Sequence, residues 1–228
     1  MNDSHHPVIF IIPALNEDGT VGAVVSSLKK YGEVVVVDDG STDSTTLIAQ
    51  DKGAQVISHQ FRSGYDQAII TGFNYALSKN FQWAITVDAD GQHDITNIPL
   101  FLSVINSSRK IDLLIGIREV FPRVGEKIMS YFFRLVWGVF DPLCGLKAYN
   151  LDFYRNNLPV IKKTFDSIGT EIMLNYLVHN SVIHQESIKI LERIDAPRYG
   201  DTWRVNIRIL KSIGHICSNF LFKKKNNE

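Results

Sequence analysis

The sequence predicts an α/β protein in which a mostly parallel sheet is flanked by helices. From residue 8 to about 116, short apolar runs rich in β-branched residues alternate with segments of helical periodicity, a pattern typical of βαβ units. Several of these runs are apolar throughout, as expected of strands that helices cover on both faces. At 228 residues the chain is long enough to bury a full core without a disulfide or a structural metal.

The first half of the chain supplies most of this prediction. We expect strands at residues 8–12, 33–37, 55–58, 83–87 and 112–116. Between them, helical periodicity predicts helices at 21–30, 45–52, 68–79 and 98–106. Ser44 precedes the second helix, where a hydroxyl can accept a hydrogen bond from a free amide of the first turn. We therefore predict that Ser44 caps that helix.

The second half is less regular. We expect a helix rich in aromatic residues at 124–139, a turn around Asp141, Pro142 and Gly145, a helix at 164–178, a strand at 187–194 and a loop at 197–201. A C-terminal amphipathic helix follows, and its apolar residues recur at a spacing of three to four: Val205, Ile209, Ile213, Ile216, Phe220 and Leu221. Lys223, Lys224 and Lys225 come after it. We predict one α/β domain over 1–202 and a terminal amphipathic helix with a basic tail over 203–228.

Composition excludes several classes of protein. The 24 basic residues balance the 24 acidic residues, so no global field attracts nucleic acid, and we expect no nucleic-acid partner. Cys144 and Cys217 lack the spacing of zinc or redox sites, and the first residues lack the pattern of a signal peptide, so we expect a cytoplasmic protein. Charged residues interrupt the longest apolar run, at 131–146, which predicts no membrane-spanning helix.

Dense polar segments follow four of the predicted strands. These segments are residues 13–17, 38–43, 88–93 and the arginine at position 118. In an open parallel sheet, ligands bind beyond the carboxyl ends of the strands. The four segments therefore predict one binding site at this edge of the sheet.

The segment DADGQH at 88–93 favours a divalent cation. Asp88 and Asp90 alternate along an extended chain, so both carboxylates point the same way, and such hard oxygen ligands suit Mg²⁺ or Mn²⁺ carrying a phosphate. A calcium-binding EF-hand loop is excluded, because His93 stands where that loop needs glycine and Pro99 where it needs glutamate. The phosphate loop of ATPases and the GxGxxG fingerprint of dehydrogenases are absent.

Four blocks in this order carry a resemblance to a known family: VIFIIPALNE, VVVVDDGSTDST, RSGYDQAIITG and TVDADGQHD. Together they resemble the family 2 glycosyltransferases with the GT-A fold, which has a Rossmann-like sheet, and especially the branch of dolichyl-phosphate mannose synthase. The resemblance covers about residues 6 to 202. Two later segments, DPLCGLKAY at 141–149 and PRYGDT at 197–202, are similar to further motifs of this family.

The resemblance implies an enzyme that binds a nucleotide-diphospho-sugar across the strand ends. The residues that would line the base and ribose are Pro13, Ala14, Asn16 and Glu17. Asp39 would accept from an imide N–H of the base, and Asp88 would lie near the ribose and the metal. Asp90 and Gln92 would hold Mg²⁺ or Mn²⁺ against the pyrophosphate, where the cation stabilises the leaving group. Arg198, in a loop with Gly200, would close over the same charge.

The acceptor implied by this branch is a polyprenyl phosphate, which is already an anion, so inverting attack on C1 needs no strong base. Arg118 matches the arginine that contacts the acceptor phosphate, but Glu126 stands where these relatives have another arginine, with Lys127 and Arg123 as substitutes. The alternative acceptor is a hydroxyl of a growing polysaccharide or glycan, which would need a carboxylate base. Asp141 is the first candidate for that base, unless it only caps its turn, and Glu171 is the second.

Two further alternatives concern the kind of protein and its surroundings. A protein that binds nucleotide sugars without turnover fits the same motifs, although the presence of Asp88, Asp90 and Gln92 together argues against it. A nucleotidyltransferase fits less well, because PALNE replaces the phosphate loop of such enzymes. The aromatic helix and the terminal helix either pack against the sheet or lie on an anionic membrane, a peripheral contact at its inner face. The aromatic residues are Tyr131, Phe132, Phe133, Trp137 and Phe140.

Overall fold

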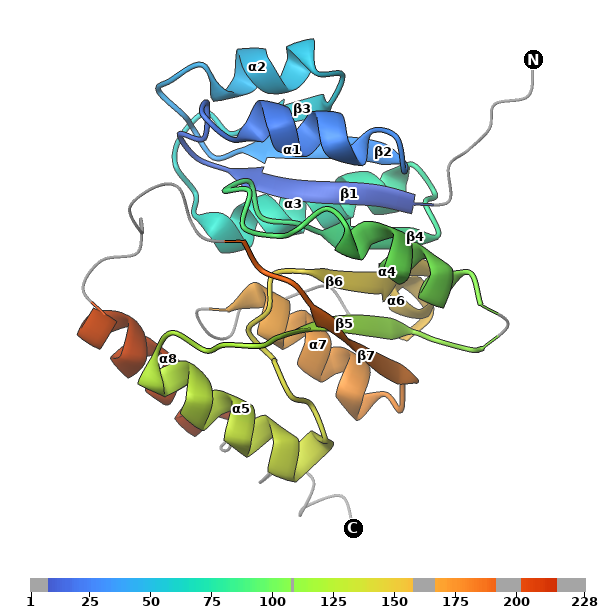
Figure 1. The fold of residues 1–228 in the computed structure, drawn as a ribbon, viewed down its shortest axis with the longest axis vertical. Coiled ribbons are helices and arrows are strands. Elements are labelled where there is room, and N and C mark those ends of the chain that lie inside the picture. The colour runs from blue at the N-terminus through green and yellow to red at the C-terminus, as the bar shows by residue number, and fades with distance from the viewer. Residues whose placement is uncertain (1–7, 108, 158–166, 192–201, 217–228) are drawn as a thin grey trace.

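A computed structural model describes residues 8–107, 109–157, 167–191 and 202–216. Its seven-stranded sheet has the order β3-β2-β1-β4-β6-β5-β7 (Figure 1). The strands are β1 (Val8–Ala14), β2 (Glu33–Asp38), β3 (Gln55–Ser58), β4 (Trp83–Thr86), β5 (Leu113–Arg118), β6 (Lys147–Asn150) and β7 (Ile183–Ile188). β6 is antiparallel to both of its neighbours, and the other pairs are parallel. The predicted mostly parallel α/β fold is confirmed.

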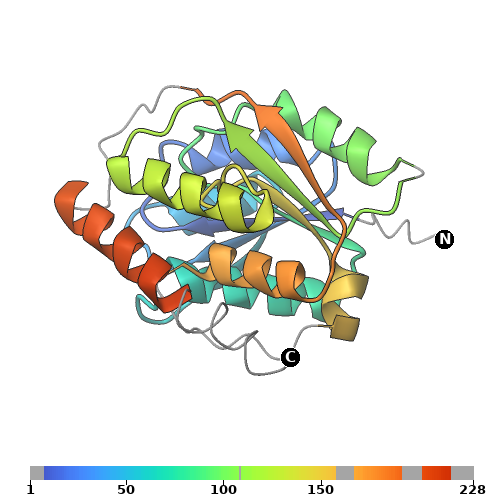
Figure 2. The same ribbon diagram turned by 90° about the horizontal axis from the view of Figure 1, so that it is seen from below.

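Helices cover both faces of this sheet (Figures 1 and 2). They are α1 (Val21–Leu28), α2 (Thr45–Asp51), α3 (Tyr65–Ser78), α4 (Asn97–Ile105), α5 (Val124–Trp137), α6 (Leu151–Asn157), α7 (Ile168–Val178) and α8 (Thr202–Ile216). Along β1, alternate residues enter two separate cores because successive side chains of a strand point to opposite faces. Phe10 packs with α1 and α4, whereas Ile11 packs with α3 and α7.

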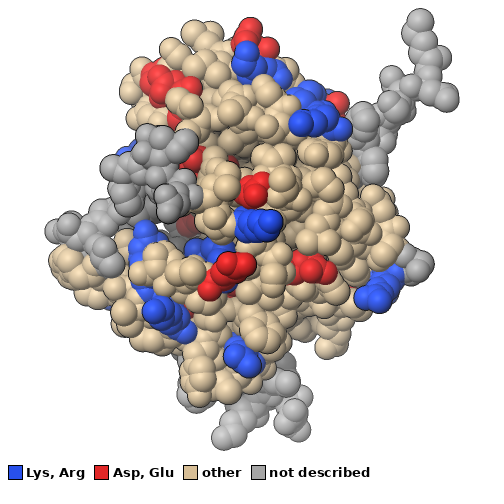
Figure 3. Space-filling model, in the orientation of Figure 1, with Lys and Arg blue, Asp and Glu red and all other residues tan. Residues whose placement is uncertain are grey.

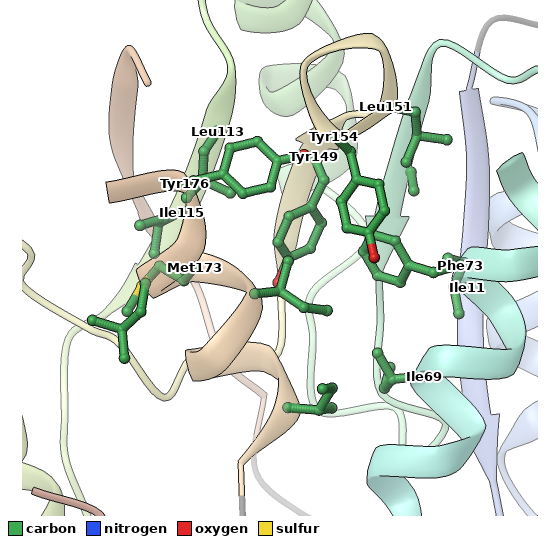
Figure 4. Close-up of a cluster of buried hydrophobic side chains, with 14 of the residues drawn as sticks. Ile11, Ile69, Phe73, Leu113, Ile115, Tyr149, Leu151, Tyr154, Met173 and Tyr176 are labelled. Atoms are coloured by element: carbon green, nitrogen blue, oxygen red, sulfur yellow. The ribbon is translucent and has the colours of Figure 1, made fainter. Parts of the chain in front are cut away.

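The core beneath α3 and α7 is rich in aromatic side chains (Figure 4). Phe73 meets Tyr149 edge to face at 5.0 Å between ring centroids, and Tyr149 contacts Tyr176 at 5.8 Å. The hydroxyl of Tyr176 donates to the backbone carbonyl of Asn150. Because Tyr149 belongs to β6, this cluster fixes the antiparallel strand between its two neighbours.

Four local features differ from the predictions, and one of them is helix α6, in a segment where no helix is expected. No strand was predicted at 147–150, although β6 lies in the middle of the sheet. The sequence predicts a strand at 187–194, whereas β7 lies at Ile183–Ile188, because an edge strand accommodates the polar residues 184–187. Ser44 stands at the start of α2 but makes no capping hydrogen bond with its side chain; Asp43 accepts from the Thr45 N–H at 2.9 Å instead.

The terminal helix α8 packs against the body of the protein. Ile209 and Ile216 from the predicted apolar stripe join the same core as Phe133 of α5. The loop at 197–201, Phe220, Leu221 and the three lysines lie outside the described residues, and the division of the chain at residue 202 stays a prediction. Among the helices described here, none is both long and apolar enough to cross a bilayer.

Candidate active site

The loops after β1 and β2 are joined to each other at the carboxyl edge of the sheet. Asn16 adopts a left-handed backbone with φ of 52°, a conformation that asparagine tolerates better than most residues. Its N–H donates to Ser41 Oγ at 2.8 Å, and its Oδ1 accepts from the Thr42 N–H at 2.8 Å. The buried Glu17 follows, and its N–H donates to Thr45 Oγ1 at 2.7 Å. Hydrogen bonds thus hold the predicted nucleoside-binding residues Asn16 and Glu17 against the loop after β2. Pro13 and Ala14 are the last residues of β1, directly before this segment.

Asp39 organises the next part of this edge. One carboxylate oxygen accepts from the N–H of Ser63 and the other from the N–H of Gly64, each at 2.7 Å. Gly64 has φ of 93°, which favours glycine at this point. His59 Nδ1 lies 2.9 Å from Asp39 Oδ1, and His59 Nε2 lies 3.0 Å from Thr71 Oγ1. Asp39, which is buried, therefore fixes the segment that enters α3.

Asp88, just after β4, is held by the side chains of Tyr65 and His93 and lies against the backbone of Gly145. The Tyr65 hydroxyl donates to Asp88 Oδ1 at 3.1 Å. The backbone N–H of Asp88 donates to His93 Nδ1 at 3.3 Å, so the imidazole proton sits on Nε2, 3.9 Å from Asp88 Oδ2. Gly145 lies so close that an added Cβ would be 2.2 Å from Asp88 Oδ2. These contacts leave the Asp88 carboxylate about one-third exposed.

The donor set in this loop fits the divalent cation that the sequence predicts. Asp88, Asp90 and Gln92 offer only oxygen ligands, and Asp90 Oδ1 accepts from the Gln92 N–H at 3.0 Å. Within the described part of the chain, no three His, Cys, Asp or Glu side chains converge into a closed metal centre. Mg²⁺ in nucleotide sites is held by one or two carboxylates together with phosphate oxygens and water, so this open arrangement suits it.

The segment that follows β7 supports this loop from behind. The Leu191 N–H donates to the Gln92 carbonyl at 2.8 Å, and His93 pairs with Ile190 in an isolated antiparallel bridge. Asn97 adds two hydrogen bonds with the backbone of Lys189. Arg198 comes a few residues later in the chain, outside the described residues, and its predicted role stays a prediction.

Arg118, at the end of β5, belongs to a chain of alternating charges. Its Nε and Nη2 donate to the two oxygens of Asp141 at 2.7 and 3.0 Å. On its other side, Nη2 lies 3.2 Å from Glu126 Oε2, and Glu126 Oε1 accepts from Arg123 Nη1 at 2.7 Å. Burial alone would lower the pKa of the Arg118 guanidinium, but hydrogen bonding and attraction by Asp141 raise it above its ordinary value. Arg118 is thus a permanent cation in a cluster of zero net charge.

Glu126 departs from ordinary pairing. Its side chain is almost fully buried, and its Oε2 has a close cation in Arg118 but no well-aligned hydrogen bond. A buried carboxylate oxygen without a hydrogen bond destabilises the folded state. Here the positive charges of Arg118 and Arg123 offset that cost.

A small cavity of about 60 Å³ is lined by residues of α3, β4, β6 and α7 and of the turn before β6. Tyr65, Thr86, Gly145, Lys147 and Thr170 are among the residues that line it. The Lys147 ammonium donates to the Cys144 carbonyl, and its burial lowers its pKa. Cys144 is fully buried; burial, reinforced by the charge of Asp141, raises the pKa of its thiol to about 12.

The structure brings most of the predicted site residues to one edge of the sheet. The two candidate bases, Asp141 and Glu171, are both buried. Asp141 is fully buried and bound by Arg118, so both of its oxygens are engaged. Glu171 lies in the first turn of α7, buried. Sequence reasoning missed Tyr65, His59 and Gly145, since each reaches the site from an element outside the strand-end motifs.

Comparisons with known proteins agree with this geometry. The family model described as "Glycosyl transferase family 2" matches residues 9–183. An undecaprenyl-phosphate mannosyltransferase of Micrococcus luteus is 30% identical, over 65% of this chain and 68% of its own. A UDP-N-acetylglucosamine–dolichyl-phosphate N-acetylglucosaminyltransferase of Methanococcus voltae is 29% identical, over 63% and 69%.

Solved structures extend the agreement to the fold. Glucosyl-3-phosphoglycerate synthase of Mycobacterium tuberculosis, in complex with Mn²⁺, uridine diphosphate and phosphoglyceric acid, superposes with a TM-score of 0.73 at 18% identity, over 92% of this chain and 77% of that one. The likeness confirms the GT-A fold. The family match, the fold and the strand-end site together establish that this chain belongs to glycosyl transferase family 2 and is a glycosyltransferase.

Proposed function

We propose that this enzyme transfers a sugar, with inversion at C1, from a nucleotide-diphospho-sugar to the phosphate of a polyprenyl phosphate, and that it uses Mg²⁺ or Mn²⁺. The observation that carries the proposal is the fixed guanidinium of Arg118 at the end of β5. Only a turn of the chain separates its partner Asp141 from Gly145, which touches Asp88. The names of the two lipid-phosphate transferases support the same acceptor class.

On the donor side, the joined loops after β1 and β2 would receive the nucleoside, with Asp39 facing the base. Asp88, Asp90 and Gln92 would hold the cation, which when bound supplies Lewis-acid stabilisation to the leaving diphosphate. Tyr65 and His93 would keep the Asp88 carboxylate oriented toward it. Arg198 would add positive charge on the same side.

On the acceptor side, Arg118 has donors to spare. A guanidinium carries five N–H groups, and the contacts made by the described residues use Nε and Nη2 but not Nη1. Arg123 stands beside it with Nη1 alone engaged among those contacts. An acceptor phosphate held there presents an oxygen that is already anionic. That oxygen bonds to C1 as the bond to the donor's β-phosphate breaks, and the electron pair leaves with the nucleoside diphosphate.

The alternative, a hydroxyl acceptor, would need a carboxylate that takes a proton. Asp141 is poorly suited, because Arg118 occupies both of its oxygens and solvent does not reach it. Glu171 is buried on α7 and already has an interaction partner. The arrangement therefore favours an acceptor that brings its own negative charge.

The test supplies radiolabelled nucleotide sugars and Mn²⁺ to the purified enzyme with three acceptors: a polyprenyl phosphate, the matching polyprenol and a soluble glycan. We expect label in the organic phase with the phosphate only. Arg118→Lys, which keeps the charge but loses the planar fork, should raise the KM for the lipid phosphate while donor binding survives. Transfer to the polyprenol or the glycan, with none to the polyprenyl phosphate, would overturn the lipid-phosphate acceptor and leave the assignment as a glycosyltransferase intact.

A further inference from the structure

Helix α5 carries an apolar stripe that faces solvent. Val124, Ile128, Tyr131 and Leu135 follow one another at a spacing of four, three and four residues, which places them on one side of the helix. Each of them is at least 44% exposed. The side that packs against the sheet carries a different set, including Met129 and Phe133. The aromatic content of this helix is therefore divided between core and surface.

Helix α8 has the same design. Ile209 and Ile216 of its predicted apolar stripe are buried, whereas Trp203, Ile207 and Leu210 are exposed on another side at a spacing of four and three. A helix that buries one apolar face has no packing reason to carry a second one. Contiguous exposed apolar surface of this kind marks an interaction site.

The two exposed stripes lie next to each other. α5 and α8 run side by side in both ribbon views (Figures 1 and 2), and the Gly125 N–H donates to Asn206 Oδ1 at 2.9 Å. At 100° per residue, Gly125 lies between the buried Met129 and the exposed Ile128 on α5. Asn206 lies likewise between the buried Ile209 and the exposed Leu210 on α8. Both stripes therefore border the helix contact on its outer side, and we call them together the α5–α8 face.

The exposed charges that the structure describes on α5 and α8 themselves are positive. Lys127 and Arg134 of α5 and Lys211 of α8 are exposed, and Figure 3 shows lysine and arginine side chains over α5. The acidic residue of α5, Glu126, is buried between two arginines, and the sequence of α8 contains no acidic residue. The guanidinium of Arg134 stacks on the ring of Phe140 at 4.8 Å, so it stays at the surface.

We infer that the α5–α8 face rests on the surface of an anionic lipid bilayer. Apolar side chains with Tyr131 and Trp203 among them suit the boundary between head groups and acyl chains, where aromatic residues with a polar tip are favoured. The flanking cations lie at the level of the anionic head groups. Neither a second copy of this chain, which repeats the same positive charge, nor a neutral surface offers this complementarity.

This face also leads to the acceptor site, a step that rests on the proposed function. Arg123 directly precedes Val124, the first residue of the exposed stripe, and its ion-pair partner Glu126 contacts Arg118. A polyprenyl phosphate anchored in the bilayer would present its phosphate at the head-group level. The face would thus bring that phosphate to the start of α5 without withdrawing the lipid from the membrane.

The test is co-sedimentation of the full chain with vesicles of phosphatidylcholine alone or mixed with phosphatidylglycerol. We expect binding to the anionic vesicles that salt weakens. Lys127→Glu with Lys211→Glu should weaken it about 30-fold or more, since each lysine near the surface contributes about fivefold and each new carboxylate adds repulsion. Tyr131→Ser with Leu135→Ser should also weaken it. The matched controls, Lys30→Glu with Lys110→Glu and Leu47→Ser with Leu100→Ser, alter exposed residues of other elements and should bind as the wild type does.

Three results would overturn the inference. The control variants lose as much vesicle binding as the face variants, either pair of face variants binds as the wild type does, or the wild type does not bind anionic vesicles. A dimer, seen by light scattering, that Tyr131→Ser with Leu135→Ser dissociates would overturn it as well. Vesicle binding needs no turnover, whereas transfer to a short-chain polyprenyl phosphate in solution needs no vesicle. The vesicle assay therefore tests the membrane contact, and the transfer assay tests the lipid-phosphate acceptor, independently of each other.

Discussion

Replacing Gly145 by alanine should damage the cation site without damaging the fold. Gly145 has no positive φ, so its backbone accepts alanine. The obstacle is space, since the new methyl carbon would lie 2.2 Å from Asp88 Oδ2 and 2.9 Å from its Cγ. Ordinary contact begins at 3.4 Å, so the carboxylate must retreat by roughly 1 Å.

The size of the effect follows from how Asp88 is held. Tyr65 and His93 contact the same carboxylate, so a movement of this size breaks at least one of those contacts. A displacement of about 1 Å in a group that positions the reacting atoms costs about 100-fold in rate. We expect kcat/KM to fall by about that factor, together with most of the gain in nucleotide affinity that Mn²⁺ provides.

Turnover measurements give kcat/KM, and calorimetry of nucleoside diphosphates with and without Mn²⁺ gives the gain in affinity. Thermal unfolding shows whether the fold is intact. Gly214→Ala is the matched control, because a Cβ at that helical position meets nothing within 4 Å. Wild-type turnover and an intact Mn²⁺ effect in Gly145→Ala would show that Asp88 does not position the cation.

Four other variants test separate parts of the site. Asp90→Asn removes the anion that faces the cation, so the Mn²⁺-dependent gain in nucleotide affinity should vanish and turnover should fall by orders of magnitude; calorimetry and turnover decide. Asp39→Ala removes the carboxylate that accepts from the N–H groups of Ser63 and Gly64, so urea unfolding should show a loss of about 1–3 kcal/mol of stability, together with weaker nucleotide binding. Asp141→Asn leaves the mostly buried Arg118 without its main partner and should cost about 3 kcal/mol, measured in the same way. The unfolded Cys144 thiol ionises near pH 9 and the folded one near 12, so stability falls as pH rises between these values; Cys144→Ala should remove about 1.4 kcal/mol of that fall between pH 8 and pH 10.

The fold was largely predictable because its parallel strands are signalled locally. β1, β2 and β4 are short apolar runs that start within a residue of the predicted positions. β6 gave no such signal, since it contains Lys147 and Asn150 and follows a turn. Its strand conformation comes from pairing with two distant strands and from a carbonyl partner for the buried ammonium of Lys147.

The site divides in the same way. The carboxylates at the strand ends were predictable, because alternation and the sheet edge fix where they lie. The groups that hold them were not: Tyr65 comes from α3, and Gly145 acts by lacking a side chain. The engagement of Arg118 by Asp141 and Glu126 joins three elements that no spacing in the sequence relates. Ion pairs of this kind depend on tertiary structure.

The antiparallel strand β6 also has a consequence for how the chain is made. β4 and β5 are both complete by residue 118, yet each has one edge that only residues 147–150 cover. During synthesis β4 must therefore wait for β6, and β5 for both β6 and β7, with unpaired edges that can bind other nascent chains. A chaperone that acts on this protein should be needed most while residues 119–188 are being added, and a fragment that stops before Lys147 should aggregate.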